Sequence, residues 1–360
     1  MRLFEWLASQ GLSMQAVEHR CRGDIFAHAG DFRRAIAEYT YAIELQGDAP
    51  ELYHSRGRAY AAMGDFDRAI SDLTQGVALA PREVEMLQSR GSIFASAGML
   101  EHAVADFTSA ISIEPLNADV WFCRGKAHLA LGDVDQAICN LMQAVRLRPD
   151  DGPAHGHLGK AIYLKGHGAA AIEELTAAIR LGFKESATFA CRGCAYLEAG
   201  DLKQAVTDLT QALRLNPNDS GTQYHLGIAH AKQGKTRKAV ADFTAAIHLD
   251  AGACHAYFNR GVILVKAGAV DRAIFDFTNV IHNDFGKSKA NAYYARGRAY
   301  FEKREYEKAV ADYGSAIELR PTFASAFYHR SLAYAALGKH ALAQEDVAAS
   351  RIAASGDGHS

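Results

Sequence analysis

The sequence predicts an all-α fold made of about ten tandem helix-turn-helix repeats. Three observations lead to this prediction. A small residue recurs every 34 residues, and each repeat contains two segments whose apolar residues have helical spacing. The chain of 360 residues also has only seven prolines and is 49% hydrophobic. A fixed period of this length is typical of a solenoid, in which each repeat is one supersecondary element.

The recurring small residue defines the register of the repeats. It occurs at Gly23, Gly57, Gly91, Gly125, Gly159, Gly193, Gly227, Gly261, Gly297 and Ser331. Each step is 34 residues, except the 36 residues from Gly261 to Gly297. We number each repeat so that this residue is position 8. Ten repeats then cover residues 16–353, after an N-terminal segment 1–15 and before a tail 354–360 that we expect to be disordered.

The elements of one repeat follow from the residues at fixed positions. Positions 4, 8 and 11 form one face of a first helix, and positions 20, 24 and 27 form one face of a second. Glycine at position 15, replaced only by Arg304 in the ninth repeat, ends the first helix. An aspartate often follows and begins the second helix. Proline at position 32 ends the second helix in five repeats. The small residue at position 8 and the alanine at position 20 allow the two helices to approach closely.

The joint between the eighth and ninth repeats departs from the pattern. Two additional residues fall within segment 282–291, and Phe285 replaces the proline of the joint. Phe183 replaces it after the fifth repeat. We expect a longer joint at 282–291 and a local change of superhelical pitch.

These positions resemble the tetratricopeptide repeat, and the resemblance covers nearly the whole chain. It implies a right-handed superhelix in which the first helices line a concave groove. One such repeat cannot bury its apolar face alone, so the core consists of contacts between neighbouring repeats. The resemblance also implies that positions 2, 5, 6, 9, 12 and 13 of each first helix face the groove.

Opposite charges recur at two fixed positions. Position 7 is arginine in eight repeats, with Leu158 and Leu226 in the other two. Position 23 is acidic in nine repeats and Asn140 in the fourth. We expect each arginine to pair with an acid of its own repeat or of the preceding one. The preceding repeat is slightly preferred, because Asn140 would then face Leu158. The alternative is that the row of arginines binds an acidic ligand.

The aromatic residues of the groove indicate a binding surface. Position 5 is aromatic in the last four repeats, and polar residues flank these rings. The candidate groove residues are Tyr224, His225, Phe258, Asn259, Tyr294, Arg298, Tyr328 and His329, with Lys126 and Lys160 in the fourth and fifth repeats. Aromatic and arginine side chains on a rigid surface are typical of protein interfaces. We expect a segment of another protein to bind here, and the alternative is that the rings only pack between helices.

Some members of the family bind the terminal carboxylate of chaperones with a clamp that includes lysine at position 5. No repeat of this chain has lysine at position 5. That type of site is therefore not expected.

The sequence contains no motif for catalysis. Cys191 and Cys194 share a helix face, but no second cysteine pair or nearby histidine pair completes a metal site. No phosphate-binding loop, nucleophile elbow or His-Glu-x-x-His motif is present. We therefore expect a non-enzymatic scaffold without a cofactor or metal. A self-assembling structural protein, and a regulator that uses Cys191 and Cys194, are the alternatives.

The composition restricts the partners and the compartment. A formal net charge of −2 argues against nucleic acid as a partner. No apolar run approaches the length of a transmembrane helix, and the first residues lack the apolar core of a signal peptide. Six cysteines in a chain of this length do not make a disulfide scaffold, so a cytoplasmic location is expected, with homo-oligomers as an alternative to a different protein partner.

Overall fold

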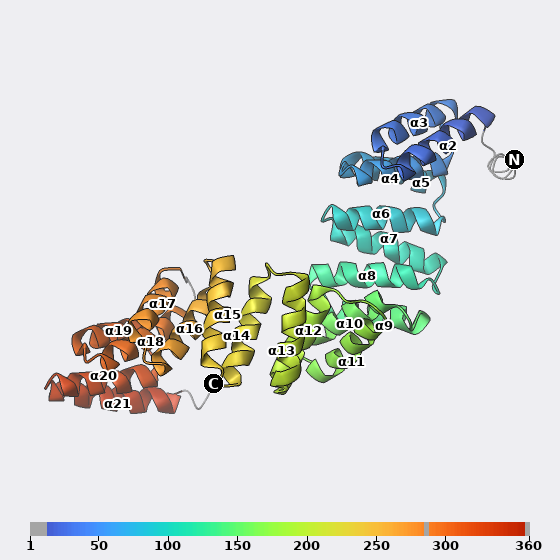
Figure 1. Cartoon of the computed structure of the whole chain (residues 1–360). Helices are drawn as coiled ribbons and strands as arrows, with labels where there is room; N and C mark the ends of the chain where they lie inside the picture. The colour runs from blue at the N-terminus through green and yellow to red at the C-terminus, as the bar shows by residue number, and fades with distance from the viewer. Residues whose placement is uncertain (1–12, 284–287, 357–360) are drawn as a thin grey trace. The chain divides into compact units, whose positions relative to one another are not determined.

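The computed structural model describes residues 13–283 and 288–356, and these contain twenty helices and no strand (Figure 1). The chain divides after Lys184 into two compact halves, each of which is described by itself. Each half contains five helix pairs, which confirms the predicted all-α array of ten helix-turn-helix repeats.

The first half contains repeats one to five. Its helices are α2 (Met14–His28), α3 (Phe32–Leu45), α4 (Pro50–Ala62), α5 (Phe66–Leu79), α6 (Val84–Ser96), α7 (Leu100–Ile113), α8 (Ala118–Leu131), α9 (Val134–Leu147), α10 (Gly152–Leu164) and α11 (Gly168–Arg180). The two helices of each repeat pack against each other, and each second helix also packs against the first helix of the next repeat within this half.

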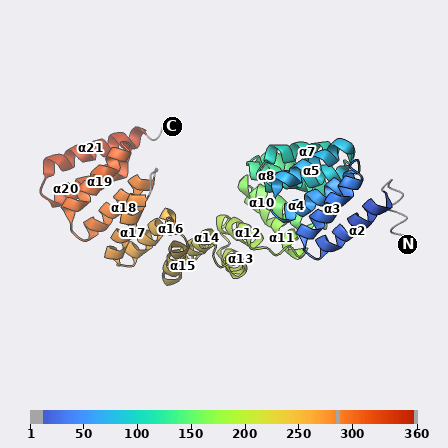
Figure 2. The same ribbon diagram turned by 90° about the horizontal axis from the view of Figure 1, so that it is seen from above.

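The second half contains repeats six to ten. Its helices are α12 (Ser186–Ala199), α13 (Leu202–Leu215), α14 (Ser220–Lys232), α15 (Thr236–Leu249), α16 (Cys254–Lys266), α17 (Val270–Asn283), α18 (Ser288–Glu302), α19 (Tyr306–Leu319), α20 (Ala324–Ala336) and α21 (His340–Gly356). They are stacked in chain order, which can be followed from α12 to α21 in Figure 2.

The turn inside each repeat forms as the sequence predicts. Every glycine at position 15 has a positive φ, between 72° at Gly338 and 88° at Gly166. Arg304 takes the same left-handed conformation, with φ of 62°. In four repeats the aspartate after the glycine caps the second helix; the Asp65 carboxylate, for example, accepts the backbone N–H of Arg68.

Close contact between the paired helices depends on the small residue at position 8. A Cβ atom on Gly227 would lie 2.7 Å from the Phe243 ring at position 24, and one on Gly297 would lie 2.9 Å from the Tyr313 ring. The tenth repeat has Ser331 at position 8, and there position 24 is the smaller Val347. The large side chain at position 24 thus fills the space that a side chain at position 8 would otherwise occupy.

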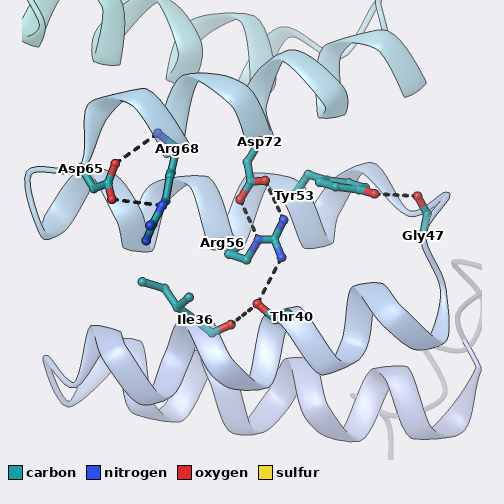
Figure 3. Close-up of polar contacts among 8 residues, drawn as sticks. All are labelled: Ile36, Thr40, Gly47, Tyr53, Arg56, Asp65, Arg68 and Asp72. Carbon is teal, nitrogen blue, oxygen red and sulfur yellow. Dashed lines mark hydrogen bonds and ion pairs between the residues drawn. The ribbon is translucent and has the colours of Figure 1, made fainter.

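The arginine at position 7 pairs with the acid of its own repeat, so the preference for the preceding repeat was wrong. The Arg56 guanidinium donates from Nε and Nη2 to the Asp72 carboxylate, both at 2.7 Å (Figure 3). The same two-bond pair forms at Arg90–Asp106, Arg192–Asp208, Arg260–Asp276, Arg296–Asp312 and Arg330–Asp346. First and second helices of one repeat run side by side, which brings positions 7 and 23 together.

The preceding repeat is contacted through a threonine instead. Arg56 Nη1 donates to Thr40 Oγ1 at 3.1 Å, and Thr40 lies on α3 of the repeat before (Figure 3). Equivalent bonds join Arg90 to Thr74, Arg124 to Thr108, Arg260 to Thr244 and Arg296 to Thr278. One guanidinium therefore connects three helices.

Three repeats satisfy the acid at position 23 with histidine. His155 Nδ1 lies 2.6 Å from the Glu174 carboxylate, and His230 Nδ1 lies 2.6 Å from that of Asp242. These are the two repeats that have leucine at position 7. In the first repeat His19 contacts Glu38 in the same way, while Arg22 binds Glu18.

The joint and the tail differ in part from the expectation. Residues 284–287 lie outside the described residues, and so the predicted change of pitch there is not described. The helix that follows, α18, begins two residues before position 1 of its repeat, which accommodates part of the longer joint. At the C-terminus α21 continues to Gly356, so residues 354–356, expected to be disordered, are helical. Residues 357–360 and most of the segment 1–15 lie outside the described residues.

Substitution of Gly261 by alanine should lower the free energy of unfolding by about 1–3 kcal/mol, because its Cβ atom would lie 2.7 Å from the Phe277 ring. The Gly261→Ala/Phe277→Val double variant, which copies the pairing of the tenth repeat, should be more stable than the sum of the two single effects. Thermal denaturation of the four proteins measures this coupling, and strict additivity would contradict the packing argument.

Substitution of Arg260 by leucine should be more damaging, because it leaves the Asp276 carboxylate unpaired and only 1% exposed. The expected loss is roughly 3–5 kcal/mol. The triple variant Tyr257→His/Arg260→Leu/Asp276→Glu copies the arrangement of the fifth repeat and should recover most of that loss. Chemical denaturation tests both variants; a triple variant no more stable than Arg260→Leu would show that histidine does not replace the arginine.

Candidate functional site

Three of the aromatic residues at position 5 in the second half pack on the aromatic residues at position 24 of their own repeats. Tyr224 packs on Phe243 with ring centroids 5.8 Å apart, and Phe258 packs on Phe277 at 5.7 Å. Tyr294 packs on Tyr313 in the same way, at 6.0 Å. These rings are half-buried, so the alternative that they pack between helices is correct for one face of each ring. Tyr328, in the repeat with Val347 at position 24, is 49% exposed.

Position 5 of one repeat also contacts position 6 of the next repeat, and we call these contacts rungs. The amide of Asn259 donates to the Tyr224 hydroxyl at 2.9 Å, and the Tyr294 hydroxyl lies 3.2 Å from His329 Nδ1. In the first half the rings of Phe122 and His157 meet edge to face at 5.4 Å. Rungs join neighbouring first helices and fill the space between them.

One rung is missing between α16 and α18, and a pocket opens there. Position 6 of the ninth repeat is Ala295, which is too small to reach Phe258. The pocket has a volume of about 320 Å³. Its lining residues are Phe258, Val262, Val265, Lys266, Phe277, Asn291, Tyr294, Ala295, Arg298 and Phe323. Most of these side chains are apolar, so the pocket suits an aliphatic or aromatic side chain.

Cations surround the entrance of this pocket. Lys266 and Arg298 are exposed, and within the described part of the chain neither forms an ion pair. The Arg320 guanidinium lies 4.0 Å from the centre of the Phe323 ring and donates to Asn291 Oδ1 at 2.5 Å. These two contacts fix Phe323 as one wall of the pocket.

The two histidines of the candidate set are held by their tyrosine neighbours. The His225 ring meets the Tyr224 ring edge to face at 5.3 Å, and burial lowers the pKa of His225. The His329 ring meets both Tyr328 and Tyr294 edge to face, at 5.4 Å each. Of the eight candidate residues of the second half, only Phe258, Tyr294 and Arg298 line the pocket.

Lys126 and Lys160 lie in the first half and flank His157. Burial lowers the pKa of His157 to about 4, and the charges of Lys126 and Lys160 act in the same direction. The Lys126 ammonium lies 5.2 Å from the centre of the Phe122 ring. Lys126 also lines a separate depression of about 360 Å³ with Phe107 and small or polar side chains of α6 and α8.

Sequence reasoning missed two residues of the second half. Phe323 lies in a joint, at a position where the other repeats have small or acidic residues such as Ala49 or Glu83. That exception could have identified it. Tyr313 occupies position 24, which is normally a core position, and no pattern distinguishes its hydroxyl group from an ordinary apolar side chain.

Two further searches of the described residues found no candidate. No group of three histidine, cysteine or acidic side chains that could hold a metal ion occurs in residues 13–283 and 288–356. Over the same ranges, no helix is long and apolar enough to span a lipid bilayer. Cys191 and Cys194 lie at positions 6 and 9 of α12, and Cys194 is only 8% exposed. Burial of this thiol favours a structural role over a redox role.

The chain is similar to several solved structures. A crystal structure of the APC/C hetero-tetramer Cut9–Hcn1 is 15% identical with a TM-score of 0.52, over 89% of this chain and 76% of that chain. YrrB, described as a tetratricopeptide repeat protein with an unusual peptide-binding site, is 21% identical with a TM-score of 0.46, over 55% of this chain and 97% of its own. MamA from Desulfovibrio magneticus is 20% identical with a TM-score of 0.45, over 47% and 96%.

Comparison with curated proteins gives no match. Two family models do match the sequence. The model described as "Tetratricopeptide repeat" matches residues 54–118, 97–150, 122–183 and 224–281, and the model described as "TPR repeat" matches residues 193–234 and 297–338. Together these segments cover well over half of the chain. The chain therefore belongs to the tetratricopeptide repeat family.

Proposed function

We propose that this protein is a non-enzymatic scaffold that binds a segment of another protein in the groove of its second half. The observation that carries the proposal is the missing rung at Ala295. It leaves an apolar pocket of about 320 Å³ between α16 and α18. A large apolar side chain of the partner occupies this pocket, and the row of half-buried rings supports the rest of the segment.

The groove supports this function for two physical reasons. The rings at position 5 are fixed by packing on one face, so little conformational entropy is lost when a partner covers the other face. The pocket lies in the middle of the row, between Tyr224 and Tyr328, where a buried anchor side chain contributes most to affinity. Catalysis is not part of the proposal, because the groove brings together rings and cations without a nucleophile and base pair.

The Ala295→His variant tests this placement of the site. Histidine at position 6 already meets a phenylalanine at position 5 between Phe122 and His157, so the substitution should close the pocket while the repeats stay folded. Affinity capture from an extract of the source cells, followed by mass spectrometry, should recover a partner on the wild type and lose it on Ala295→His. The Ala295→Ser variant keeps the pocket open and is the matched control.

Equal recovery on both variants would move the site away from this pocket. Recovery of the protein itself as the sole captured species would favour the self-assembling alternative.

A further inference from the structure

The hydroxyl group of Tyr313 is a buried polar group without a hydrogen-bond partner. Tyr313 is 0% exposed, and its hydroxyl oxygen has no donor or acceptor within bonding distance. Leaving a buried hydroxyl unpaired lowers the stability of the folded state. Burial, the first cause, raises the pKa of this tyrosine above its usual range, so the group is a neutral donor. Its proton therefore lacks an acceptor in the free protein.

The first repeat shows what normally satisfies a tyrosine at this position. Tyr39 also occupies position 24, and its hydroxyl donates to Asp24 Oδ1 at 2.7 Å. Asp24 is at position 9 of the same repeat. In the ninth repeat position 9 is Arg298, which can only donate hydrogen bonds. The ninth repeat therefore has a donor, Arg298, beside the Tyr313 hydroxyl, where the first repeat has the acceptor Asp24.

Tyr294 lies beside Tyr313 but is only half-buried. Its hydroxyl lies 3.2 Å from His329 Nδ1, which lies 2.8 Å from the backbone carbonyl of Ser325. Because that carbonyl only accepts, Nδ1 carries the proton and the Tyr294 oxygen can only accept from it. The proton of the Tyr294 hydroxyl is then available to solvent or to a ligand. The three rings of Tyr294, Tyr313 and His329 lie close together, with centroids 5.4 to 6.1 Å apart.

Arg298 is the cation of this cluster. Arg298 is exposed, and its charge lowers the pKa of both Tyr294 and Tyr313, against the larger effect of burial. Two carboxylates also act on Tyr313. Asp312 is bound by Arg296, and Glu302 is exposed one helical turn after Arg298. Neither carboxylate accepts the proton of Tyr313.

We propose that Arg298, Tyr294 and Tyr313 form a subsite for a carboxylate, supplied by an aspartate or glutamate side chain of the bound segment. One carboxylate accepts from both hydroxyls and pairs with the guanidinium, and this satisfies every donor of the cluster. The proposal rests on the proposed function and adds the chemistry of the partner. The recognised segment carries an acidic residue close to the apolar residue that enters the adjoining pocket.

Selection from a library of displayed random peptides, with no free terminal carboxylate, provides the probe. The tightest peptide is then synthesised with each aspartate or glutamate changed in turn to asparagine or glutamine. One of these changes should weaken binding to the wild type about tenfold or more. The same change should have little effect on peptide binding to Arg298→Gln or Tyr313→Phe, because these variants lack the guanidinium or the hydroxyl that would bind the carboxylate. The Glu302→Gln variant should bind as well as the wild type or better.

Thermal unfolding distinguishes a binding role of the Tyr313 hydroxyl from a structural role. Tyr313→Phe removes the unpaired hydroxyl, so the free protein should unfold at an equal or higher temperature while binding the acidic peptide more weakly. Tyr39→Phe, the matched control, removes a satisfied hydrogen bond and should unfold at a lower temperature. A structural role for the Tyr313 hydroxyl predicts the opposite shift.

Three results would overturn the subsite. Selected peptides that bind the pocket without any acidic residue would contradict the subsite and leave the proposed function standing. The amide changes could weaken binding equally on the wild type and both variants, or binding could require a free terminal carboxylate. If no selected peptide binds the wild type more tightly than the pocket-closing Ala295→His variant, the proposed function and the subsite are both contradicted.

Discussion

The guanidinium at position 7 connects three helices, and the spacing of the repeats depends on it. Two of its bonds join the first and second helices of one repeat, and a third reaches a threonine on the repeat before. Aromatic side chains at positions 4 and 11 cover it; both Tyr293 and Tyr300 lie within 6 Å of the Arg296 guanidinium. A buried ion pair of this kind adds little net stability, because desolvation offsets the attraction. Its directional bonds instead favour one register between neighbouring repeats.

Most of the fold could be predicted from the sequence, because its determinants are local. Glycine at position 15 and the capping aspartates act within a few residues of the turn that they form. The pairing of the arginines was predicted wrongly for a physical reason. Positions 7 and 23 show that the charges recur, but only the packing of the helices decides which repeat supplies the partner. The residues Asn140 and Leu158 suggested pairing with the preceding repeat. Arg124 instead bonds to Asn140 of its own repeat.

The candidate site could be predicted only in outline. The row of aromatic residues is visible in the sequence, and three of its rings pack on the second helices of their own repeats. The pocket was not foreseen, because it results from a small residue, Ala295, at a position where the seventh, eighth and tenth repeats have His225, Asn259 and His329. A small residue such as Ala295 opens a pocket only where its neighbours in the folded protein leave space, and the sequence does not show which residues those neighbours are. The unpaired hydroxyl of Tyr313 was equally hidden, since its environment comes from three helices that are separate in the sequence.

The positions that hold the repeats together and those that shape the groove alternate along the same first helix. Positions 7 and 8 face the second helix. Position 5 contacts both that helix and the next repeat, position 6 contacts the preceding repeat, and Arg298 at position 9 is exposed. A substitution at Ala295 or Arg298 can therefore change what the groove presents and leave the glycine contacts and guanidinium bonds intact. This separation gives the architecture an evolutionary modularity. A duplicated repeat keeps the residues that stack it on its neighbours. The residues that shape the groove can then change independently in each copy, and with them the ligand that each copy recognises.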